Sequence, residues 1–334
     1  MSDARLSLAA AEALVAGALR RCRTTEANAS SVARALVAAE ANGLKGHGLS
    51  RVPSYAAQAK VGKVDGAAAP TVSLARPGVL TVDAAHGFAY PALDLAVDRL
   101  PEIASRRGIA AAATRRSHHC GAAGHPVERL AERGLVALLF ANTPSAIAPW
   151  GGSHGLFGTN PIAFACPLPG SSPLVVDLSL AKVARGNIVA ARQNGEPIPE
   201  GWALDAEGRP TTDPYAALRG TMLPLGDAKG TVLALMVELL AAGLTGANYA
   251  SEASSFLDAA GPPPGTGQLI IALDPDAFGG EAVVSRFGVL AAAVESEPGA
   301  RLPGSRRLAA RAKAHAEGLT VSTRLRAEIE ALGA

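Results

Sequence analysis

One histidine of this sequence stands between two glycines, in a setting that suits proton transfer. His47 lies in the stretch LKGHGLSR, and Arg51 follows four positions later. An imidazole titrates at about pH 6.5, which suits a general acid, and a guanidinium can bind a carboxylate through two parallel hydrogen bonds. If residues 47–51 form a helical turn, this spacing places both side chains on one face. The pair predicts proton transfer beside a bound anion, and an ordinary turn histidine is the alternative interpretation.

Three more histidines gather in SHHCGAAGHP, residues 117–126. Clustered imidazoles suggest a metal site, but His118 and His119 are adjacent, and adjacent side chains on a strand point to opposite faces. No acidic residue stands nearby at ligand spacing. We therefore predict no metal here. A histidine bonded to the backbone of a loop is the plain alternative for either residue.

Three other stretches are suited to anions. PWGGSHGLFGTNPIAF (149–164) offers backbone amides together with Thr159 and Asn160, although a tight connection between two strands is the simpler explanation when it is taken alone. VVDLSLAKVARGNI (175–188) ends a strand at Asp177 and continues into a basic loop. Lys229 and Gly230 begin a helix, where a cation and free amides suit a phosphate.

The familiar nucleotide and hydrolase motifs are missing. No GxGxxG follows a strand, and GxxxxGK[ST], HExxH and CxxC do not occur. The sequence therefore gives no support to a Rossmann or P-loop phosphate cradle, and the chemistry must be sought in the histidines.

Composition limits the class of protein. The chain has 334 residues, of which 49% are hydrophobic, and it carries a net charge of +2 without a basic stripe. This length allows a well-buried core and two domains, and the charge predicts no binding to nucleic acid. Three widely spaced cysteines fit a reducing compartment. No apolar run is long enough for a signal peptide or a membrane span, so we expect a cytoplasmic protein without membrane contact.

Apolar periodicity predicts alternating helices and strands without a strict βαβ rhythm. Thr25 is expected to cap the second helix and Gly43 to end it. The predicted helices cover 7–22, 25–42, 51–60, 89–108 and 125–134, and the predicted strands cover 78–84, 109–116, 135–143, 162–167, 174–180 and 267–275. The last strand is expected to be central, residues 229–247 to be the clearest buried helix, and the tail from residue 281 to be helical with RLPGSRR interrupting it.

Taken together, these stretches resemble the type-2 malate/L-lactate dehydrogenase family, a group of NAD(P)-dependent oxidoreductases with a non-Rossmann fold. The matching landmarks run in order from about residue 40 to 307. They are GHGLSRVPSY, VDAAHGFAYPAL, SHHCGAAGHP, NTPSAIAPWGG, LFGTNPIAFACP, VVDLSLAKVARGNI, PEGWALDAEGRPTTDP, LGDAKG, MVELLAAGLTGA, TGQLIIALDP and RLPGSRR. The resemblance implies a mixed α/β fold with a central mixed sheet and a helical part built from both ends of the chain.

The resemblance also implies roles for particular residues. His47 matches the proton donor, Arg51 the arginine that grips the substrate carboxylate, and Thr159 a substrate contact, with His119 at the border of substrate and cofactor. The positions expected to hold NADPH or NADH, with NADP favoured, are His119, Cys120, Gly121, Ala122, Ala123, Asp177, Leu178, Ser179, Arg185, Gly186, Lys229 and Gly230.

Several pieces are most similar to the Δ1-piperideine-2-carboxylate/Δ1-pyrroline-2-carboxylate reductases, which reduce a cyclic C=N bond beside a carboxylate. Members of that branch commonly have a serine before the histidine and an aspartate at a second relay position, where this chain has Gly46 and Asn187. A malate- or lactate-type 2-hydroxy-acid dehydrogenase therefore stays open as the first alternative, and an inactive NAD(P)-binding protein as the second. The substrate is expected to be a small anion in each active case.

The same resemblance implies a homodimer and a division of the chain. Residues 1–75 and 281–334 are expected to form a helical part for substrate and dimer contacts, and residues 76–280 an NAD(P)-binding α/β domain. A 2′-phosphate needs a cation, and Lys182, Arg185 and the run Arg301–Arg307 offer one.

Overall fold

The computed structural model describes residues 4–333 and is built on one seven-stranded mixed sheet. Only β3 and β4 run parallel, and every other neighbouring pair is antiparallel. Across the sheet the strands are β2 (Thr71–Arg76), β3 (Val79–Asp83), β4 (Ile109–Ser117), β11 (Thr266–Leu273), β5 (Val136–Ala141), β6 (Ile162–Leu168) and β7 (Ser171–Leu178). The predicted mixed α/β fold is confirmed, and the sheet has no doubly wound parallel order.

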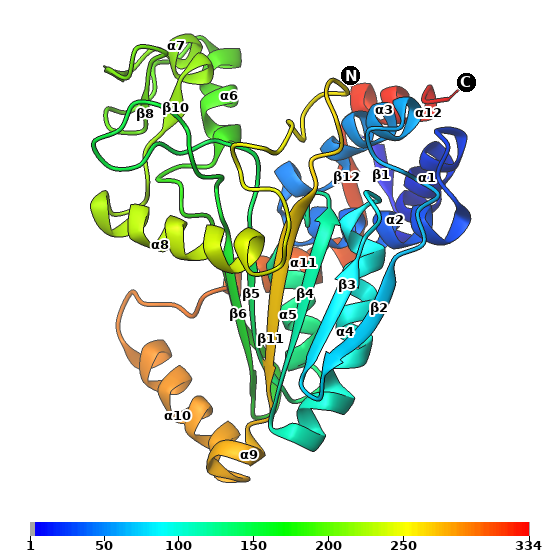
Figure 1. Cartoon of the computed structure of the whole chain (residues 1–334), viewed down its shortest axis with the longest axis vertical. Helices are drawn as coiled ribbons and strands as arrows, with labels where there is room; N and C mark the ends of the chain where they lie inside the picture. The colour runs from blue at the N-terminus through cyan, green and yellow to red at the C-terminus, as the bar shows by residue number, and fades with distance from the viewer. Residues whose placement is uncertain (1–3, 334) are drawn as a thin grey trace.

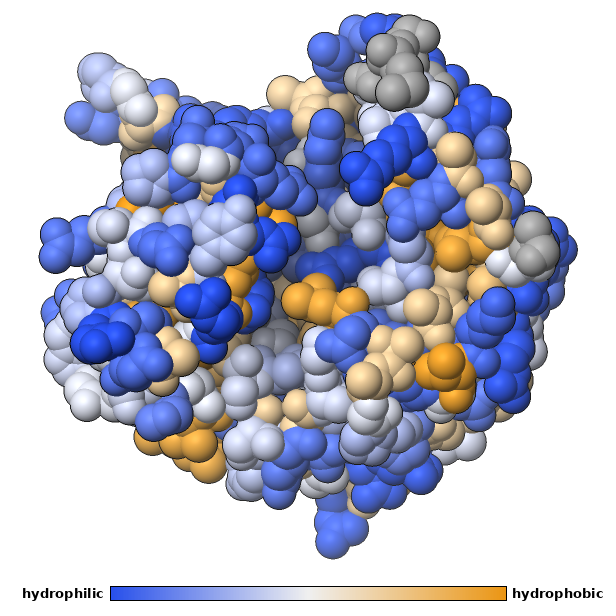
Figure 2. Space-filling model, turned by 90° about the horizontal axis from the view of Figure 1, so that it is seen from above, coloured by the Kyte–Doolittle hydropathy of each residue, from blue (hydrophilic) through white to orange (hydrophobic). Residues whose placement is uncertain are grey.

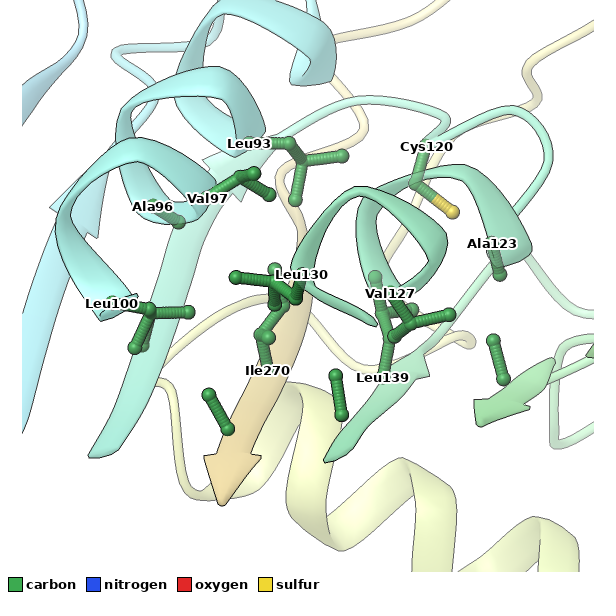
Figure 3. Packing of buried hydrophobic residues seen from close by; sticks show 14 of the residues in the cluster. Leu93, Ala96, Val97, Leu100, Cys120, Ala123, Val127, Leu130, Leu139 and Ile270 are labelled. Atoms are coloured by element: carbon green, nitrogen blue, oxygen red, sulfur yellow. The ribbon is translucent and has the colours of Figure 1, made fainter. Parts of the chain in front are cut away.

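Helices cover both faces of this sheet (Figure 1). On one face lie α4 (Ala89–Arg107) and α5 (Gly124–Ala131), whose Leu93, Val97 and Leu130 belong to one buried cluster with Ile270 of the central strand, and Figure 3 shows Leu130 next to Ile270. Strand β4 is IAAAATRRS, and its small alanines let α4 approach the sheet closely. The other face carries α8 (Ala228–Glu238) and the π-helical turn Leu239–Gly243, which pack on β5 and β11.

Both ends of the chain build a second core beside the sheet, at the upper right of Figure 1. It contains α1 (Leu8–Arg21), α2 (Glu26–Ala41), α3 (Val52–Val61), α11 (Ser305–Glu317) and α12 (Thr323–Glu330). Strands β1 (Ala4–Leu6) and β12 (Leu319–Val321) pair antiparallel and tie the two ends together. The predicted helices at the N-terminus and in the tail are confirmed, and Gly43 follows α2 with φ +76°.

A small third unit follows β7 and carries its own buried cluster around Ile188 and Met222. It is made of α6 (Arg185–Asn194), β8 (Ala203–Leu204), β9 (Pro210–Thr211), α7 (Pro214–Arg219) and β10 (Thr221–Met222). The remaining helices are α9 (Asp276–Gly279) and α10 (Ala282–Ser296), and α10 packs on β6 rather than on the terminal helices. Seen from above, the molecule is hollowed between the small unit and the helical lobe (Figure 2). The division at residues 75 and 281 stays a prediction.

Strand β11 confirms one sequence expectation, and α8 corrects another. The strand lies between β4 and β5, so the apolar run at 267–275 is central as predicted. Residues 229–247, expected to form the clearest buried helix, are instead partly exposed to solvent, because Val232 is 66% exposed and Leu239 is 52% exposed. The helix is apolar on all sides, but in a single chain the sheet covers only one of them.

Among residues 4–333, no helix is long and apolar enough to cross a membrane. In the same part of the chain, no group of three or more His, Cys, Asp or Glu side chains is placed to hold a metal ion.

Candidate active site

The histidine between two glycines lies in a pair of short 3-10 turns after α2. The first turn is η1 (Lys45–His47) and the second is η2 (Leu49–Arg51). Gly48 between them has φ −97° and ψ −140°, so residues 47–51 are not the continuous helical turn that the spacing suggested. Glu40 of α2 holds the bend, since its Oε2 accepts the amide of Leu49 at 2.9 Å. The orientation of His47 is therefore set by a carboxylate seven residues upstream.

The two glycines that flank His47 are under opposite steric constraints. A Cβ at Gly48 would lie 2.2 Å from Oε2 of Glu40 and 3.1 Å from its Cα, whereas a Cβ at Gly46 would meet nothing within 4 Å. We expect Gly48→Ala to displace the turn, cost about 1–3 kcal/mol of unfolding free energy and lower kcat/KM. Gly46→Ala is the matched control and should match the parent in stability. Denaturant unfolding measures both, and equal stability of the two variants would contradict the assigned role of Glu40.

Arg51 gives the site a positive charge that no carboxylate neutralises. Its Nε donates to the carbonyl of Gly46 at 2.6 Å, which fixes the guanidinium beside His47, and the side chain is only partly exposed. It forms no ion pair with any of residues 4–333. The charge is nevertheless felt by its neighbours, because Arg51 contributes to lowering the pKa of His47, His118 and His119. Arg51 thus lies beside His47, as expected from the sequence, but two 3-10 turns rather than one helical turn place it there.

His119 packs against His47 from the loop after β4. The two rings are stacked with centroids 5.3 Å apart and planes 22° apart. Burial, with a smaller contribution from Arg51, lowers the pKa of His47 to about 4, and burial lowers the pKa of His119 well below its usual value. Both imidazoles are therefore neutral at pH 7. Nδ1 of His47 is buried and has no hydrogen-bond partner within residues 4–333.

His118 belongs to the supporting wall of the site. Its Nε2 lies 2.9 Å from Oε1 of Gln58 on α3, and burial lowers its pKa to about 3. The ring of Phe256 contacts His118 and His119, with centroids 5.0 and 5.1 Å away. Gln58 also donates to the carbonyl of Phe256 at 2.9 Å. Helix α3 thus connects the histidines to the loop that carries Phe256.

A buried lysine fastens that loop. Nζ of Lys63, whose side chain is 1% exposed, donates to the carbonyls of Ser255, Asp258 and Ala260 at 2.7, 3.0 and 2.6 Å. We expect Lys63→Met to lower the free energy of unfolding by about 2–3 kcal/mol, because buried carbonyls then lose their donor. Lys60→Met, at an exposed position near the end of the preceding helix α3, is the control and should change stability by less than about 0.5 kcal/mol. Equal melting temperatures for both variants would contradict this role.

The loop at residues 119–123 has the features of a dinucleotide cradle. The amides of Gly121, Ala122 and Ala123 make no hydrogen bond to residues 4–333 and precede α5, where the helix dipole favours an anion. Gly121 has φ +69°, and a Cβ there would lie 2.5 Å from Oη of Tyr90. Asp177, at the end of β7, accepts the amide of Gly124 at 2.8 Å. Free amides beside a carboxylate suit a phosphate and a ribose hydroxyl, so these residues fit NAD(P)H.

The other residues of this loop and strand end are also near the cradle. Cys120 is buried, and burial raises the pKa of its thiol to about 12, so it stays protonated and packs as an apolar side chain. Leu178 is partly exposed beside Asp177. Oγ of Ser179 donates to the carbonyl of Thr159 at 3.3 Å, which brings these two predicted positions together.

A buried carboxylate holds the loop that carries Thr159. The amide and Oγ1 of Thr159 contact Oγ1 of Thr143 at 2.8 and 3.3 Å. Glu238 accepts hydrogen bonds from the side chains of Asn142 and Asn160 at 3.0 and 2.7 Å. Because Glu238 ends α8 where the π-helical turn begins, the packing of that helix fixes the strand ends under the site.

The remaining predicted cofactor positions lie farther out. Arg185, Gly186 and Asn187 form the first turn of α6 in the small unit, and Arg185 donates to the carbonyl of Leu218 at 3.1 Å. None of the three contacts the histidines among residues 4–333. The amide of Lys229 donates to Gly226, so it is not the free group expected at this helix start, whereas its ammonium group is exposed.

Gly230 has a packing role in this structure. A Cβ there would lie 1.8 Å from the carbonyl oxygen of Leu225, so only glycine fits. Close approach of α8 to the preceding loop therefore depends on this position.

Sequence reasoning assigned no role to Tyr55, Tyr90 or Phe256. Oη of Tyr55 lies 2.6 Å from Nδ1 of His119 and 3.3 Å from Oη of Tyr90, and both tyrosines are buried. Tyr55 follows Arg51 by four residues at the start of α3, so helical spacing could have indicated that it lies near the site. No local signal connects Tyr90 or Phe256 to the site.

Proton transfer beside an anion, with a backbone cradle for a dinucleotide nearby, is the chemistry of a dehydrogenase or reductase. The sheet order separates this chain from the Rossmann class of such enzymes. Residues 6–330 match the family model described as malate/L-lactate dehydrogenase. The chain belongs to the malate/L-lactate dehydrogenase family and is an NAD(P)-dependent oxidoreductase.

Three relatives show how far the similarity extends. The chain is 53% identical over 306 residues to a (2R)-3-sulfolactate dehydrogenase (NADP(+)) of Chromohalobacter salexigens, covering 92% of this chain and 91% of that protein. It is 42% identical over 332 residues to a Δ1-pyrroline-2-carboxylate/Δ1-piperideine-2-carboxylate reductase of Pseudomonas aeruginosa, covering 98% and 99%. The crystal structure of Δ1-piperideine-2-carboxylate reductase from Pseudomonas syringae pv. tomato superposes with a TM-score of 0.94 at 37% identity, covering 98% and 99%.

Proposed function

We propose that this chain uses NAD(P)H to reduce a C=N or C=O bond next to a carboxylate, with His47 as the proton donor. The observation that carries the proposal is the guanidinium of Arg51, which is fixed beside His47 by Gly46 and has no carboxylate partner within residues 4–333. A carboxylate bound by Arg51 places carbon 2 of the substrate next to the imidazole.

Binding of the anion also prepares the acid. In the free protein the pKa of His47 is about 4, because the imidazole is buried and Arg51 repels its proton. A substrate carboxylate on Arg51 offsets that repulsion and adds a negative neighbour, and both effects raise the pKa of His47. His47 then holds the proton for the reacting oxygen or nitrogen. The nicotinamide, when bound in the cradle at residues 119–123, supplies the hydride.

Cyclic imino acids are the first substrate class. The Pseudomonas aeruginosa relative and the solved Pseudomonas syringae structure bear names of this activity, at 42% and 37% identity over nearly the whole chain. On this proposal the ring nitrogen of Δ1-piperideine-2-carboxylate or Δ1-pyrroline-2-carboxylate lies at His47, and Thr159 borders the ring.

A 2-hydroxy acid of the sulfolactate or malate type is the second class, and specific observations favour it. The relative named for (2R)-3-sulfolactate is 53% identical. Gly46 and Asn187 replace the serine and aspartate of the reductase branch, and neither can relay a proton. Nδ1 of His47 has no partner among residues 4–333.

One panel assay separates these classes. NADPH and NADH oxidation is followed with the two cyclic imino acids, 3-sulfopyruvate, oxaloacetate and pyruvate. The highest kcat/KM on a cyclic imino acid supports the reductase, and the highest on a 2-oxo acid supports the dehydrogenase. Absence of turnover with all five, together with thermal protection by NADPH, would support the inactive nucleotide-binding alternative.

We infer that NADPH is preferred over NADH. The support is the name of the 53% identical relative and the exposed ammonium of Lys229 near the start of α8. Lys182 is a second candidate cation, and it pairs with Asp227, the residue that precedes α8. Arg307 is less available, because it pairs with buried Glu128. A lower KM for NADPH than for NADH in the same assay is the expected result.

We propose a homodimer in which a second copy covers α8. Val232 and Leu235 of α8 are 66% and 45% exposed, and Leu239 and Leu244, which begin and follow the π-helical turn, are 52% and 66% exposed. A monomer seldom leaves such an apolar patch open. Sedimentation should give twice the chain mass, and Leu239→Glu should shift the equilibrium toward monomer. A monomeric parent chain would contradict the proposal.

The three buried free cysteines support a reducing compartment, and we propose the cytoplasm.

A further inference from the structure

A chain of buried hydroxyl groups ends on the second histidine of the site. Oη of Tyr90 lies 3.3 Å from Oη of Tyr55, which lies 2.6 Å from Nδ1 of His119. Tyr55 is fully buried on α3, and Tyr90 comes from α4. Tyr55 meets His119 at the ring edge, through Nδ1, whereas His47 stacks on a face of the same ring.

The direction of the hydrogen bonds follows from charge and from the need to satisfy both hydroxyls. His119 is neutral, so only one of its nitrogens carries a proton. If Tyr55 donates to Nδ1, its oxygen is free to accept from Tyr90, and both buried hydroxyls are satisfied. The reverse direction would leave Tyr90 without an acceptor among residues 4–333, so the hydroxyl of Tyr55 donates to Nδ1.

The remaining nitrogen of His119 must carry the proton. Nε2 makes no hydrogen bond to residues 4–333, and it is not one of the buried atoms that lack a partner. It is therefore the polar atom of this ring that is open to solvent in the site. Besides burial, the groups that lower the pKa of His119 are Arg51 and His47 of segment 45–51 and His118 of the same loop.

We propose that Tyr55, backed by Tyr90, is a positioning residue that fixes the ring orientation and the Nε2–H tautomer of His119, so that His119 donates a neutral hydrogen bond to the substrate anion held by Arg51. The inference rests on the proposed function for the identity of the anion. It goes beyond that function because it gives Tyr55 a role and gives His119 one tautomer. A neutral donor complements Arg51 without adding a second positive charge beside His47.

Nitrogen NMR of the whole protein tests the tautomer without any turnover. In ¹⁵N-histidine-labelled parent protein, the His119 signals should show a protonated Nε2 and an unprotonated Nδ1 that accepts a hydrogen bond. Tyr55→Phe keeps the buried ring and removes the hydroxyl, so the Nδ1 signal should move toward that of a free imine nitrogen. Tyr90→Phe removes a hydroxyl from the same cluster but none from His119, and should leave the Nδ1 signal close to that of the parent. A protonated Nδ1 in the parent would overturn the proposal.

Steady-state kinetics test the consequence. Tyr55→Phe should raise KM for the carboxylate substrate about fivefold to twentyfold, with KM for NADPH unchanged within twofold and a smaller effect for Tyr90→Phe. An unchanged substrate KM, or a change confined to the NADPH KM, would overturn the assignment of His119 to the substrate. Matching melting curves establish that the variants are folded. If the parent turns over no substrate, the proposed function fails, and the NMR result still decides the tautomer.

Discussion

Replacing His47 with glutamine should lower kcat by about 10²–10⁴-fold, the range expected when a general acid is lost. Glutamine keeps a polar side chain of similar reach, but it cannot deliver a proton at neutral pH. The turn that holds position 47 depends on Glu40 and Gly48 rather than on the imidazole, so the fold should persist. Stopped assays with the preferred substrate of the panel measure the effect.

Cofactor binding provides the control for this variant. The cradle amides at Gly121, Ala122 and Ala123 do not involve the side chain of His47, so the shift in melting temperature produced by NADPH should match that of the parent. A kcat within threefold of the parent would remove His47 from the acid role. Loss of NADPH protection would place it in the cofactor site instead.

The pH profile gives His47 a second signature. The free protein has a His47 pKa of about 4, and kcat/KM reports groups of the free enzyme. Reduction needs the protonated ring, so its kcat/KM should rise as pH falls from 7 toward 5. Oxidation of the product needs the neutral ring, so its kcat/KM should be independent of this group over that range and fall only near pH 4. A kcat/KM for reduction that falls as pH decreases from 7 toward 5 would contradict the assignment. The His47→Gln variant should show neither the rise in reduction nor the fall in oxidation.

Replacing Arg51 with alanine should raise KM for the substrate by about 30- to 900-fold, the equivalent of about 2–4 kcal/mol for a lost charged pair. The guanidinium is already fixed by Gly46 and has no carboxylate partner in the described part of the chain, so its binding free energy is available to the substrate. Arg51→Lys should fall between parent and alanine, because it keeps the charge but loses the bidentate geometry.

Lys45 is the matched control for the charge of Arg51. It lies in the neighbouring 3-10 turn η1 and is exposed, so Lys45→Ala should alter KM by less than about threefold. Arg51→Ala should also move the His47 pKa upward, since a positive neighbour is removed. An unchanged KM together with an unchanged pH profile would exclude Arg51 from the substrate site.

The sequence by itself determined the elements and the first part of the site. The apolar run in β11 and the residues that bound α2 are local signals, and they placed a central strand and the turn that carries His47 close to where they lie. The lack of a phosphate-binding motif likewise excluded a Rossmann sheet. These signals can be read from the sequence because backbone periodicity and capping depend on neighbours within a few residues.

The tertiary structure decided which of these residues meet. Tyr55 and His119 are 64 positions apart. Tyr55 lies on α3 and His119 in the loop after β4, and no rule of sequence spacing relates two such positions. The lowered pKa of His47 also arises from burial, which depends on packing of α3 and the Phe256 loop around the site. The exposed face of α8 is a third feature that only the tertiary structure shows. An apolar helix is expected to be buried, but its sequence does not indicate whether the sheet or a second chain covers it.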